Sequence, residues 1–250
     1  NINKVCASGM KSVMFAAQSL MLGNGGVVLA GGFESMTNAP HILNNYRKGH
    51  KFGDYKIIDS LAYDGLTDPY RNIAMGFCGE HTVREMGISR EMQDEYCMAS
   101  YQRALDADKK GIFANEIASL TTRRGDVVDK DEEPLRFKPD KITSLKPVFV
   151  NKEHPNGTIT SANASKINDG ACSLLIANEN GIKVNQIDPR FEILSYADAE
   201  MEPMDFNKTP SKAIYKALER ANLTLNDVNY FEINEVCIFY LFFLKIVWFA

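Results

Sequence analysis

The sequence lacks the motifs of several common protein classes. Its cysteines and histidines form no Cys-x-x-Cys pair and no zinc-ligand spacing, and unpaired cysteines favour a reducing compartment. The net charge is −4 and no dense Lys/Arg stripe occurs, so charge gives no case for nucleic acid as a partner. No short-period repeat is visible. The hydrophobic tail 236–250 contains Lys245 and is shorter than the ~20 residues of a membrane span, so a membrane partner is not expected.

What is present fits a globular enzyme. The 250 residues are 45% hydrophobic and 24% charged, ordinary values for a chain that buries a core. The chain opens at Asn1, so any targeting peptide lies outside the sequence considered.

Cys6 is the candidate nucleophile. Apolar residues from Met10 to Met21 recur with helical spacing and predict a helix over about 9–22, directly after Cys6. Unpaired N–H groups and the positive end of the helix dipole stabilise a thiolate there, and the thiolate is the form that attacks substrates. The alternative is a small cysteine that packs under the helix.

Further patterns predict the other elements. A buried strand is expected over 26–30, followed by a Gly31-Gly32 turn that carries Glu34, with the sheet buried on both faces. Ser89 is the expected N-cap and Gly111 the expected stop of a helix over 90–110. The remaining predictions are helices over 77–86 and 211–221 and strands over 117–121, 172–177, 191–195 and 230–233.

Several sequence blocks, in family order, resemble the thiolases of the acetoacetyl-CoA type. The first runs from Asn3 to Ser12 around Cys6, and the second is Ala30-Gly31-Gly32-Phe33-Glu34-Ser35-Met36. The others are 64–68, 156–165, 168–171 and Asn234-Glu235, so the resemblance covers residues 1 to about 235. A thiolase of this type is longer by roughly a third, and its fold is α/β with a layered αβαβα arrangement. The resemblance therefore implies an incomplete thiolase-like fold with an inserted loop domain.

The resemblance also implies a domain organisation. Residues 1–38 and 159–186 would form part of the N-terminal thiolase domain, and 39–158 the CoA-binding loop domain. Residues 187–235 would begin the C-terminal domain. The tail 236–250 departs from the family and is interpreted as read-through from a truncated or mis-spliced gene, with a membrane anchor as the alternative.

Site residues follow from the resemblance position by position. Cys6 would take the acyl group from acyl-CoA, and Asn234 would hold a catalytic water. Coenzyme A is implied as a substrate, with no required cofactor. The residues implied to bind it are Tyr101, Arg136, Lys141 and Ser165. A possible potassium ion would be held by Tyr101 and the backbone of Ser161, Ala162 and Ala164.

Some of these candidate site residues also have a simpler structural interpretation. Arg136 and Lys141 could be solvated loop charges, and Tyr101 could lie on a half-buried helix face. This sequence has Ala74-Met75-Gly76 where the family has His-Met-Gly, and Cys237 where an aromatic residue is expected. No histidine stands in a Gly-His-Pro motif, and the four present (His41, His50, His81 and His154) are interpreted as surface residues.

The function implied is reversible condensation of two acetyl-CoA to acetoacetyl-CoA and CoA, in a mitochondrial enzyme whose full-length relatives form homotetramers. The motifs that carry the base histidine and second cysteine are not found, so the chain itself is expected to be inactive. The alternatives are a non-catalytic CoA-binding fragment, a non-functional truncated product, or a ketosynthase relative.

Overall fold

The computed structural model describes residues 1–49, 51–152 and 154–235, which separate into two compact units. The first unit comprises residues 1–75, 166–201 and 209–232, and the second 76–165, 202–208 and 233 onward. Each unit is considered by itself. The predicted tail 236–250, with Cys237, and His50 lie outside the described residues.

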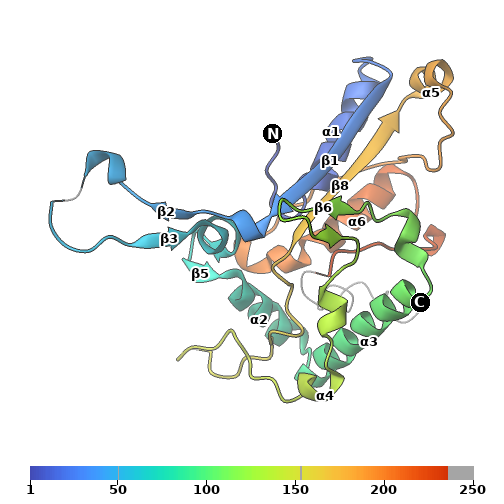
Figure 1. The fold of residues 1–250 in the computed structure, drawn as a ribbon. Coiled ribbons are helices and arrows are strands. Elements are labelled where there is room, and N and C mark those ends of the chain that lie inside the picture. The colour runs from blue at the N-terminus through green and yellow to red at the C-terminus, as the bar shows by residue number, and fades with distance from the viewer. Residues whose placement is uncertain (50, 153, 236–250) are drawn as a thin grey trace. The chain divides into compact units, whose positions relative to one another are not determined.

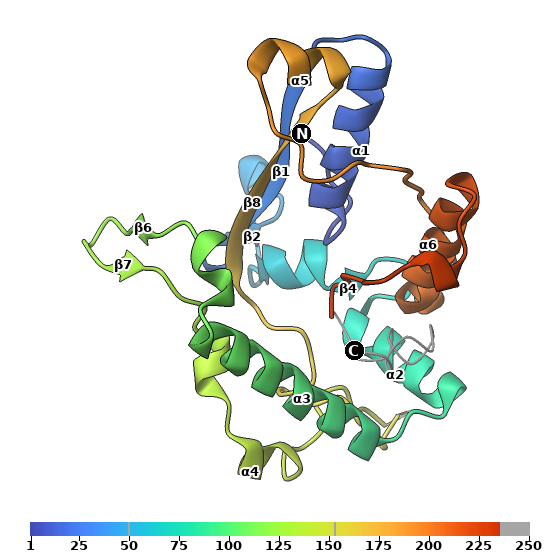
Figure 2. The same cartoon turned by 90° about the vertical axis from the view of Figure 1, so that its right-hand side faces the viewer.

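The first unit is built on one long antiparallel strand pair. Strand β1 (Val27–Ser35) pairs with β8 (Asp169–Ala177) in a register that runs from Val27 opposite Ala177 to Ser35 opposite Asp169. Helix α1 (Ser8–Met21) lies along both strands, as Figures 1 and 2 show. It buries the apolar side chains of Met14, Ala16 and Leu20, which confirms the helix predicted over 9–22.

Gly31 and Gly32 were wrongly predicted to form a turn, because both lie inside β1. They are required for close approach of the backbone. A Cβ on Gly31 would lie 2.2 Å from the carbonyl oxygen of Cys172, and one on Gly32 would lie 3.1 Å from the Cα of Gly9 in α1. The strand therefore uses glycine where it packs against β8 and α1.

The expectation of a sheet buried on both faces is also wrong for the described residues. Leu29 and Phe33 on β1 are 71% and 86% exposed, and most of β8 is exposed. Alternate residues of a strand point to opposite faces, so α1 covers the Ala30 face and leaves the Leu29 face open. Residues 191–195 and 230–233 form no strand, since no described strand lies beside them to complete a ladder.

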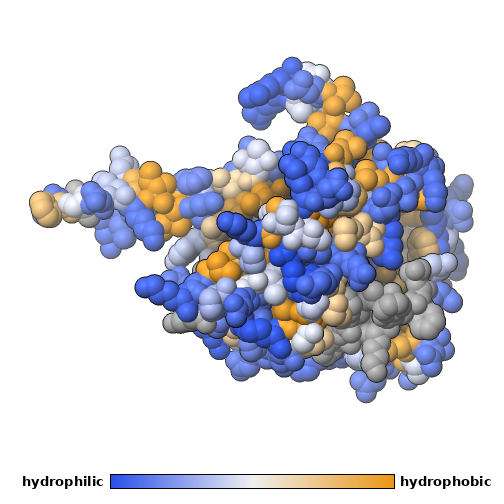
Figure 3. All heavy atoms as spheres, turned by 90° about the horizontal axis from the view of Figure 1, so that it is seen from below, coloured by the Kyte–Doolittle hydropathy of each residue, from blue (hydrophilic) through white to orange (hydrophobic). Residues whose placement is uncertain are grey.

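The rest of the first unit consists of short elements. A projecting arm pairs β2 (His41–Leu43) with β3 (Ile57–Asp59), and apolar side chains are exposed along it, including Ile57 and the 95% exposed Phe52 (Figures 1 and 3). The arm ends at a π-helix, Leu61–Gly65, and a small hairpin of β4 (Thr67–Asp68) and β5 (Ile73–Ala74) follows. The helices α5 (Glu179–Asn185) and α6 (Thr209–Arg220) complete the unit, and α6 confirms the helix predicted over 211–221.

The second unit packs around two helices, α2 (Met75–Met86) and α3 (Arg90–Lys109), close to their predicted bounds. Ser89 caps α3 by accepting a hydrogen bond from the Met92 N–H, and Gly111 follows the helix with a φ of 67°. Both features confirm the predicted start and stop signals. Among the described residues, no helix is both long and apolar enough to cross a bilayer.

Short elements and two apolar clusters complete the second unit. Its remaining elements are the 3₁₀ helices Ile112–Asn115, Glu133–Arg136 and Pro203–Lys208, the hairpin of β6 (Leu120–Thr121) and β7 (Val127–Val128), and α4 (Pro139–Ile142). The strand predicted over 117–121 is thus only two residues long. One cluster contains Val83, Ile88 and Ile159, and the other contains Tyr96, Cys97 and Ile142.

Candidate functional site

Cys6 lies on a tight turn just before α1. The Ala7 N–H donates to the Lys4 carbonyl at 3.1 Å, and the Ser8 N–H donates to the Val5 carbonyl at the same distance. Val5 has a φ of 49°, which is strained for a β-branched residue, and such strain is found at functional sites. The Cys6 side chain is exposed. The N-cap residue is Ala7, whose methyl group cannot accept a hydrogen bond, so no side chain caps the N–H groups that follow Ser8 in the first turn of α1.

The turn is held in place by a carboxylate that the sequence did not reveal. Asp198 accepts from the Nζ atoms of both Lys4 and Lys11, each at 2.5 Å, so it joins the two sides of the Cys6 turn. These two ammonium groups, Lys11 first, lower the pKa of Asp198 to about 2. Asp198 lies nearly two hundred residues from Lys4, so only the fold could show this contact.

Two serines connect the turn to the rest of the unit. The Ser8 hydroxyl accepts from the Lys4 N–H at 2.8 Å and donates to the Val5 carbonyl at 2.7 Å. On the next turn of α1, the Ser12 hydroxyl lies 2.8 Å from the carbonyl oxygen of Gly31 in β1. The candidate nucleophile is therefore carried by backbone that is tied both locally and to the sheet.

Cys6 is expected to be the most reactive thiol of the chain. Cys78 and Cys97 are buried, whereas Cys172 is exposed in the middle of β8 and is carried by a strand. Cys172 is therefore the comparison for an exposed thiol that does not directly precede a helix in the chain. In competitive alkylation with mass-spectrometric mapping, Cys6 should be modified faster than Cys172. Equal or faster modification of Cys172 in folded protein would contradict the assignment.

Tyr101 and Arg136 come together around one carboxylate in the second unit. The Tyr101 hydroxyl donates to Glu133 at 2.6 Å, and its ring stacks on Phe137 with centroids 4.9 Å apart. Burial, and then Glu133, raises the pKa of Tyr101 above its usual range. Arg136 is 68% exposed and lies 3.1 Å from Glu132 and 3.6 Å from Glu133. The guanidinium thus remains accessible to an incoming phosphate.

Lys141 and Ser165 are both exposed. Lys141 lies on α4, five residues after Arg136, and Ser165 is the last residue of its segment in the second unit. Their side chains are accessible to a ligand, and both their roles and that of Arg136 stay predictions.

The residues implied to hold a cation divide between the two apolar clusters. Tyr101 and Ala162 pack against the Tyr96 cluster, and the Ala162 carbonyl lies 3.3 Å from the Cys97 sulfur. Ala164 packs against the Val83 cluster, and Ser161 is an exposed turn residue. The structure thus brings Tyr101 and Ala162 to one cluster, and the cation site stays a prediction.

Asn234 is exposed and lies beside an anchored residue. The neighbouring Glu235 accepts hydrogen bonds from the hydroxyls of Tyr96 at 2.5 Å and Ser100 at 2.6 Å, both on α3. Burial, together with Glu235, raises the pKa of Tyr96 above its usual range. Asn234 belongs to the second unit and Cys6 to the first.

A buried polar contact of the second unit does not follow from the sequence pattern. Glu80 on α2 is 1% exposed, and one carboxyl oxygen accepts from the backbone N–H groups of Thr158 and Ile159, both at 2.7 Å. The side chain of Gln93 donates to the Thr158 hydroxyl at 2.9 Å. These contacts fix the segment that leads into Ser161–Ser165. A glutamate inside an otherwise apolar helix face was the available signal.

A second network holds the far side of the same segment. Asn163 donates from its side-chain amide to Asp94 at 3.1 Å and accepts from the Thr160 N–H at 2.8 Å. Asp94 also accepts from Arg90 at 2.7 Å, and Arg90 donates to the carbonyls of Ile142 and Leu145. The segment 158–165 is therefore positioned by buried side chains of both α2 and α3.

The Ala74-Met75-Gly76 triplet has a packing consequence. A Cβ on Gly76 would lie 2.2 Å from the ring of Phe149, so that ring rests against the backbone at the start of α2. Phe149 in turn packs on the Val83 cluster and lies edge-on to Phe77, with centroids 6.0 Å apart. Glycine at this position is needed for that contact, whichever residue precedes it.

Comparison with known proteins identifies the family. The thiolase N-terminal domain matches residues 1–180, and the thiolase C-terminal domain matches residues 179–246. The chain therefore belongs to the thiolase family.

The similar proteins include curated enzymes and a solved complex. A probable acetyl-CoA acetyltransferase from Dictyostelium discoideum is 47% identical over 94% of this chain and 56% of its own length. A mitochondrial acetyl-CoA acetyltransferase from Bos taurus is 43% identical over 94% of this chain and 55% of its own length. The crystal structure of a thiolase from Ascaris suum in complex with coenzyme A is 36% identical, with a TM-score of 0.90 over 98% of this chain and 63% of that chain. The chain thus spans 55–56% of the length of these curated relatives, so they exceed it by more than the predicted third. The predicted thiolase-like α/β fold is confirmed.

Proposed function

We propose that this chain is part of an acetyl-CoA acetyltransferase in which Cys6 carries the acyl group. The observation that carries the proposal is the placement of an exposed Cys6 on a clamped turn at the start of α1, in a member of the thiolase family. The names of its relatives support acetyl-CoA as the substrate.

The first half of the reaction follows from the chemistry of a thiolate. The Cys6 sulfur attacks the carbonyl carbon of the acyl thioester, and the carbon–sulfur bond to coenzyme A breaks. The acyl group is then on Cys6, and coenzyme A leaves as a thiolate that takes up a proton. The uncapped N–H groups of α1 favour the anionic sulfur before the attack. In the second half, a base that residues 1–250 are not proposed to supply takes a proton from the α-carbon of a second acetyl-CoA. That carbon bonds to the acyl carbonyl carbon, the bond from the acyl carbon to Cys6 breaks, and acetoacetyl-CoA forms while the Cys6 sulfur leaves as a thiolate.

The second unit supplies the surface proposed for coenzyme A. Arg136 and Lys141 are exposed cations on neighbouring short elements, and guanidinium and ammonium groups bind phosphate well. Ser165 would bond the pantetheine arm, and the aromatic stack of Tyr101 on Phe137 would border it. The solved complex of a related thiolase with coenzyme A supports this class of ligand. Tyr101 and the backbone of Ser161, Ala162 and Ala164 are retained as the proposed potassium site, with Asn234 as the proposed holder of a catalytic water.

The wider setting is also a proposal. Relatives are named mitochondrial in some cases and cytosolic in another, and we retain the mitochondrial assignment. Full-length relatives would form homotetramers. We also propose that residues 1–250 alone do not complete the cycle, because none of their histidines stands in a Gly-His-Pro motif that could supply the base. General acid–base assistance is worth about 10²–10⁴ in rate.

The two halves of the proposal can be tested separately on the 250-residue chain. Incubation with acetyl-CoA should add one acetyl group, mapped by mass spectrometry to Cys6, and a Cys6→Ala variant with the same circular dichroism spectrum should gain none. Thiolysis of acetoacetyl-CoA, followed as loss of substrate absorbance, should not exceed that of Cys6→Ala. Folded protein that gains no acetyl group on Cys6 would contradict the nucleophile assignment. Turnover above the Cys6→Ala variant would contradict only the proposed inactivity.

A further inference from the structure

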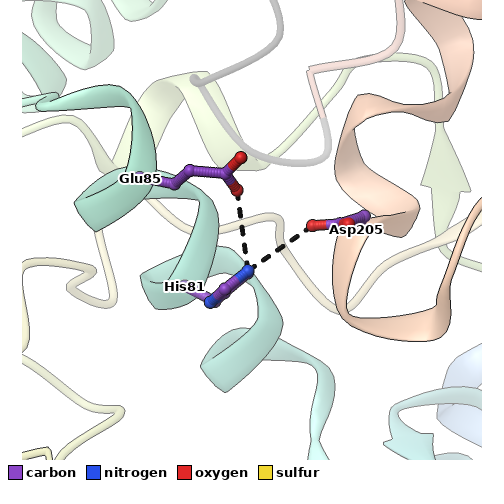
Figure 4. Close-up of side chains that lie close together, drawn as sticks. All are labelled: His81, Glu85 and Asp205. Atoms are coloured by element: carbon purple, nitrogen blue, oxygen red, sulfur yellow. Dashed lines mark ion pairs between the residues drawn. The ribbon is translucent and has the colours of Figure 1, made fainter.

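In the second unit, the side chains of a histidine and two carboxylates lie close together, and none of the three is among the predicted site residues. His81 and Glu85 are one turn apart on α2, and Asp205 lies on the 3₁₀ helix Pro203–Lys208 (Figure 4). Their ligand atoms all lie within 4.8 Å of one another. From the sequence, His81 is predicted to be a surface residue; the contact with Asp205 arises only in the fold, because the two residues are far apart along the chain.

The distances in this cluster suit a shared metal ion better than hydrogen bonds. The Nε2 atom of His81 lies 3.6 Å from an oxygen of Glu85 and 3.5 Å from an oxygen of Asp205. Both separations exceed the ~2.7–3.2 Å of an N–H···O bond. Two ligands of one tetrahedral zinc ion, each bonded at about 2.0–2.2 Å, are about 3.3–3.6 Å apart. One imidazole nitrogen and two carboxylate oxygens are also ligand types that zinc takes.

A lysine ammonium already bridges the two carboxylates. The Lys208 Nζ atom lies 2.8 Å from Glu85 Oε2 and 2.8 Å from Asp205 Oδ1, the same two oxygens that face His81. Asp205 Oδ1 is shielded from solvent, and the Lys208 side chain is only 11% exposed. The pair of carboxylates is therefore arranged around one cation, and an ion with two positive charges would replace the ammonium there.

We propose that His81, Glu85 and Asp205 form a zinc site in which Zn²⁺ and the Lys208 ammonium compete for the same two carboxylate oxygens. With a neutral imidazole, the four side chains carry a net charge of −1. A bound Zn²⁺ changes this to +1 while Lys208 is present and to 0 when its charge is removed. Water would complete the coordination, since His81 and Glu85 are 39% and 49% exposed. Bound zinc would tie the segment 203–208 to α2.

Zinc titration of a cysteine-substituted parent and three further variants tests the proposal. Isothermal titration calorimetry with Zn²⁺ alone would use the full chain with Cys6, Cys172 and Cys237 changed to serine, so that these three thiols do not bind the metal. We expect one ion per chain, binding about 10-fold weaker or more in His81→Asn, and binding about 10-fold tighter or more in Lys208→Met, because a nearby positive charge is removed. His41→Asn, a histidine on the exposed arm, is the matched control and should bind as the parent does.

Either of two results would overturn the proposal. It fails when His81→Asn binds zinc as tightly as the parent, or when Lys208→Met binds no tighter than the parent. Circular dichroism establishes that each variant is folded, and Glu85→Gln replaces His81→Asn where that variant does not fold. Co²⁺ provides a second readout, because a tetrahedral site gives intense visible absorption that should be weakened in the His81 or Glu85 variant.

Discussion

Substitution of Glu80 by alanine is expected to lower the stability of the second unit by about 3 kcal/mol or more. The carboxyl group accepts from the backbone N–H groups of Thr158, which is part-buried, and Ile159, which is buried. Alanine leaves both donors without this partner, and a buried unpaired group costs about 1–3 kcal/mol. Thermal unfolding followed by circular dichroism should show a drop of about 6–12 °C in the melting temperature.

Two further variants separate the lost hydrogen bonds from the general effect of substitution. Glu80→Gln retains an oxygen that can accept from both N–H groups, so it should be clearly less destabilising than Glu80→Ala. Glu95 is an exposed glutamate on α3, and Glu95→Ala should change stability by no more than about 0.5 kcal/mol. A difference of 2 °C in melting temperature corresponds to about half a kcal/mol or more. If Glu80→Ala and Glu95→Ala differ by less than this, the contacts of Glu80 do not contribute to stability.

Gly31→Ala is expected to destabilise the first unit by about 3 kcal/mol. The added methyl group would lie 2.2 Å from the Cys172 carbonyl oxygen and 2.9 Å from the Cα of Ser173. Both contacts are with backbone, so no side-chain rotation relieves them and the two strands must separate. Added volume in a well-packed place typically costs about 1–3 kcal/mol, and an overlap with backbone lies at the upper end.

Gly170→Ala is the matched control for this change. Gly170 lies on the paired strand β8, opposite Glu34, and a Cβ there would meet no atom within 4 Å. Chemical denaturation should give a lower midpoint for Gly31→Ala and a nearly unchanged midpoint for Gly170→Ala. Equal midpoints for the two variants would mean that the close strand approach at Gly31 does not contribute to stability.

Each of these two residues supports a different predicted site segment. Glu80 fixes the segment that leads to Ser161–Ser165, and Gly31 accepts a contact from Ser12 on the helix that follows Cys6. Loss of either contact should therefore reduce ligand binding or acyl transfer through displacement of backbone that carries those residues, without removing any group proposed to touch the substrate.

The sequence alone determined the local elements and the candidate nucleophile. Helical periodicity located α1, which buries an apolar stripe, and the sequence also placed α2, α3 and α6 to within a few residues. Capping chemistry correctly located the start of α3 at Ser89 and its end before Gly111. The quoted motifs identified the thiolase family, since their residue types recur in a fixed order that composition cannot reproduce.

Tertiary structure decided what depends on contacts between distant residues. Gly31 and Gly32 looked like a turn because glycine favours turns, but the approach of Cys172 and Gly9 explains them. The strand predicted over 191–195 failed because a strand requires a neighbour to pair with, and local propensity does not supply one. Asp198 at the Cys6 turn lies far along the chain from the groups that it contacts, as does Asp205 beside His81. Sequence patterns report periodicity within a segment, whereas ion pairs and buried hydrogen bonds depend on how segments meet in space.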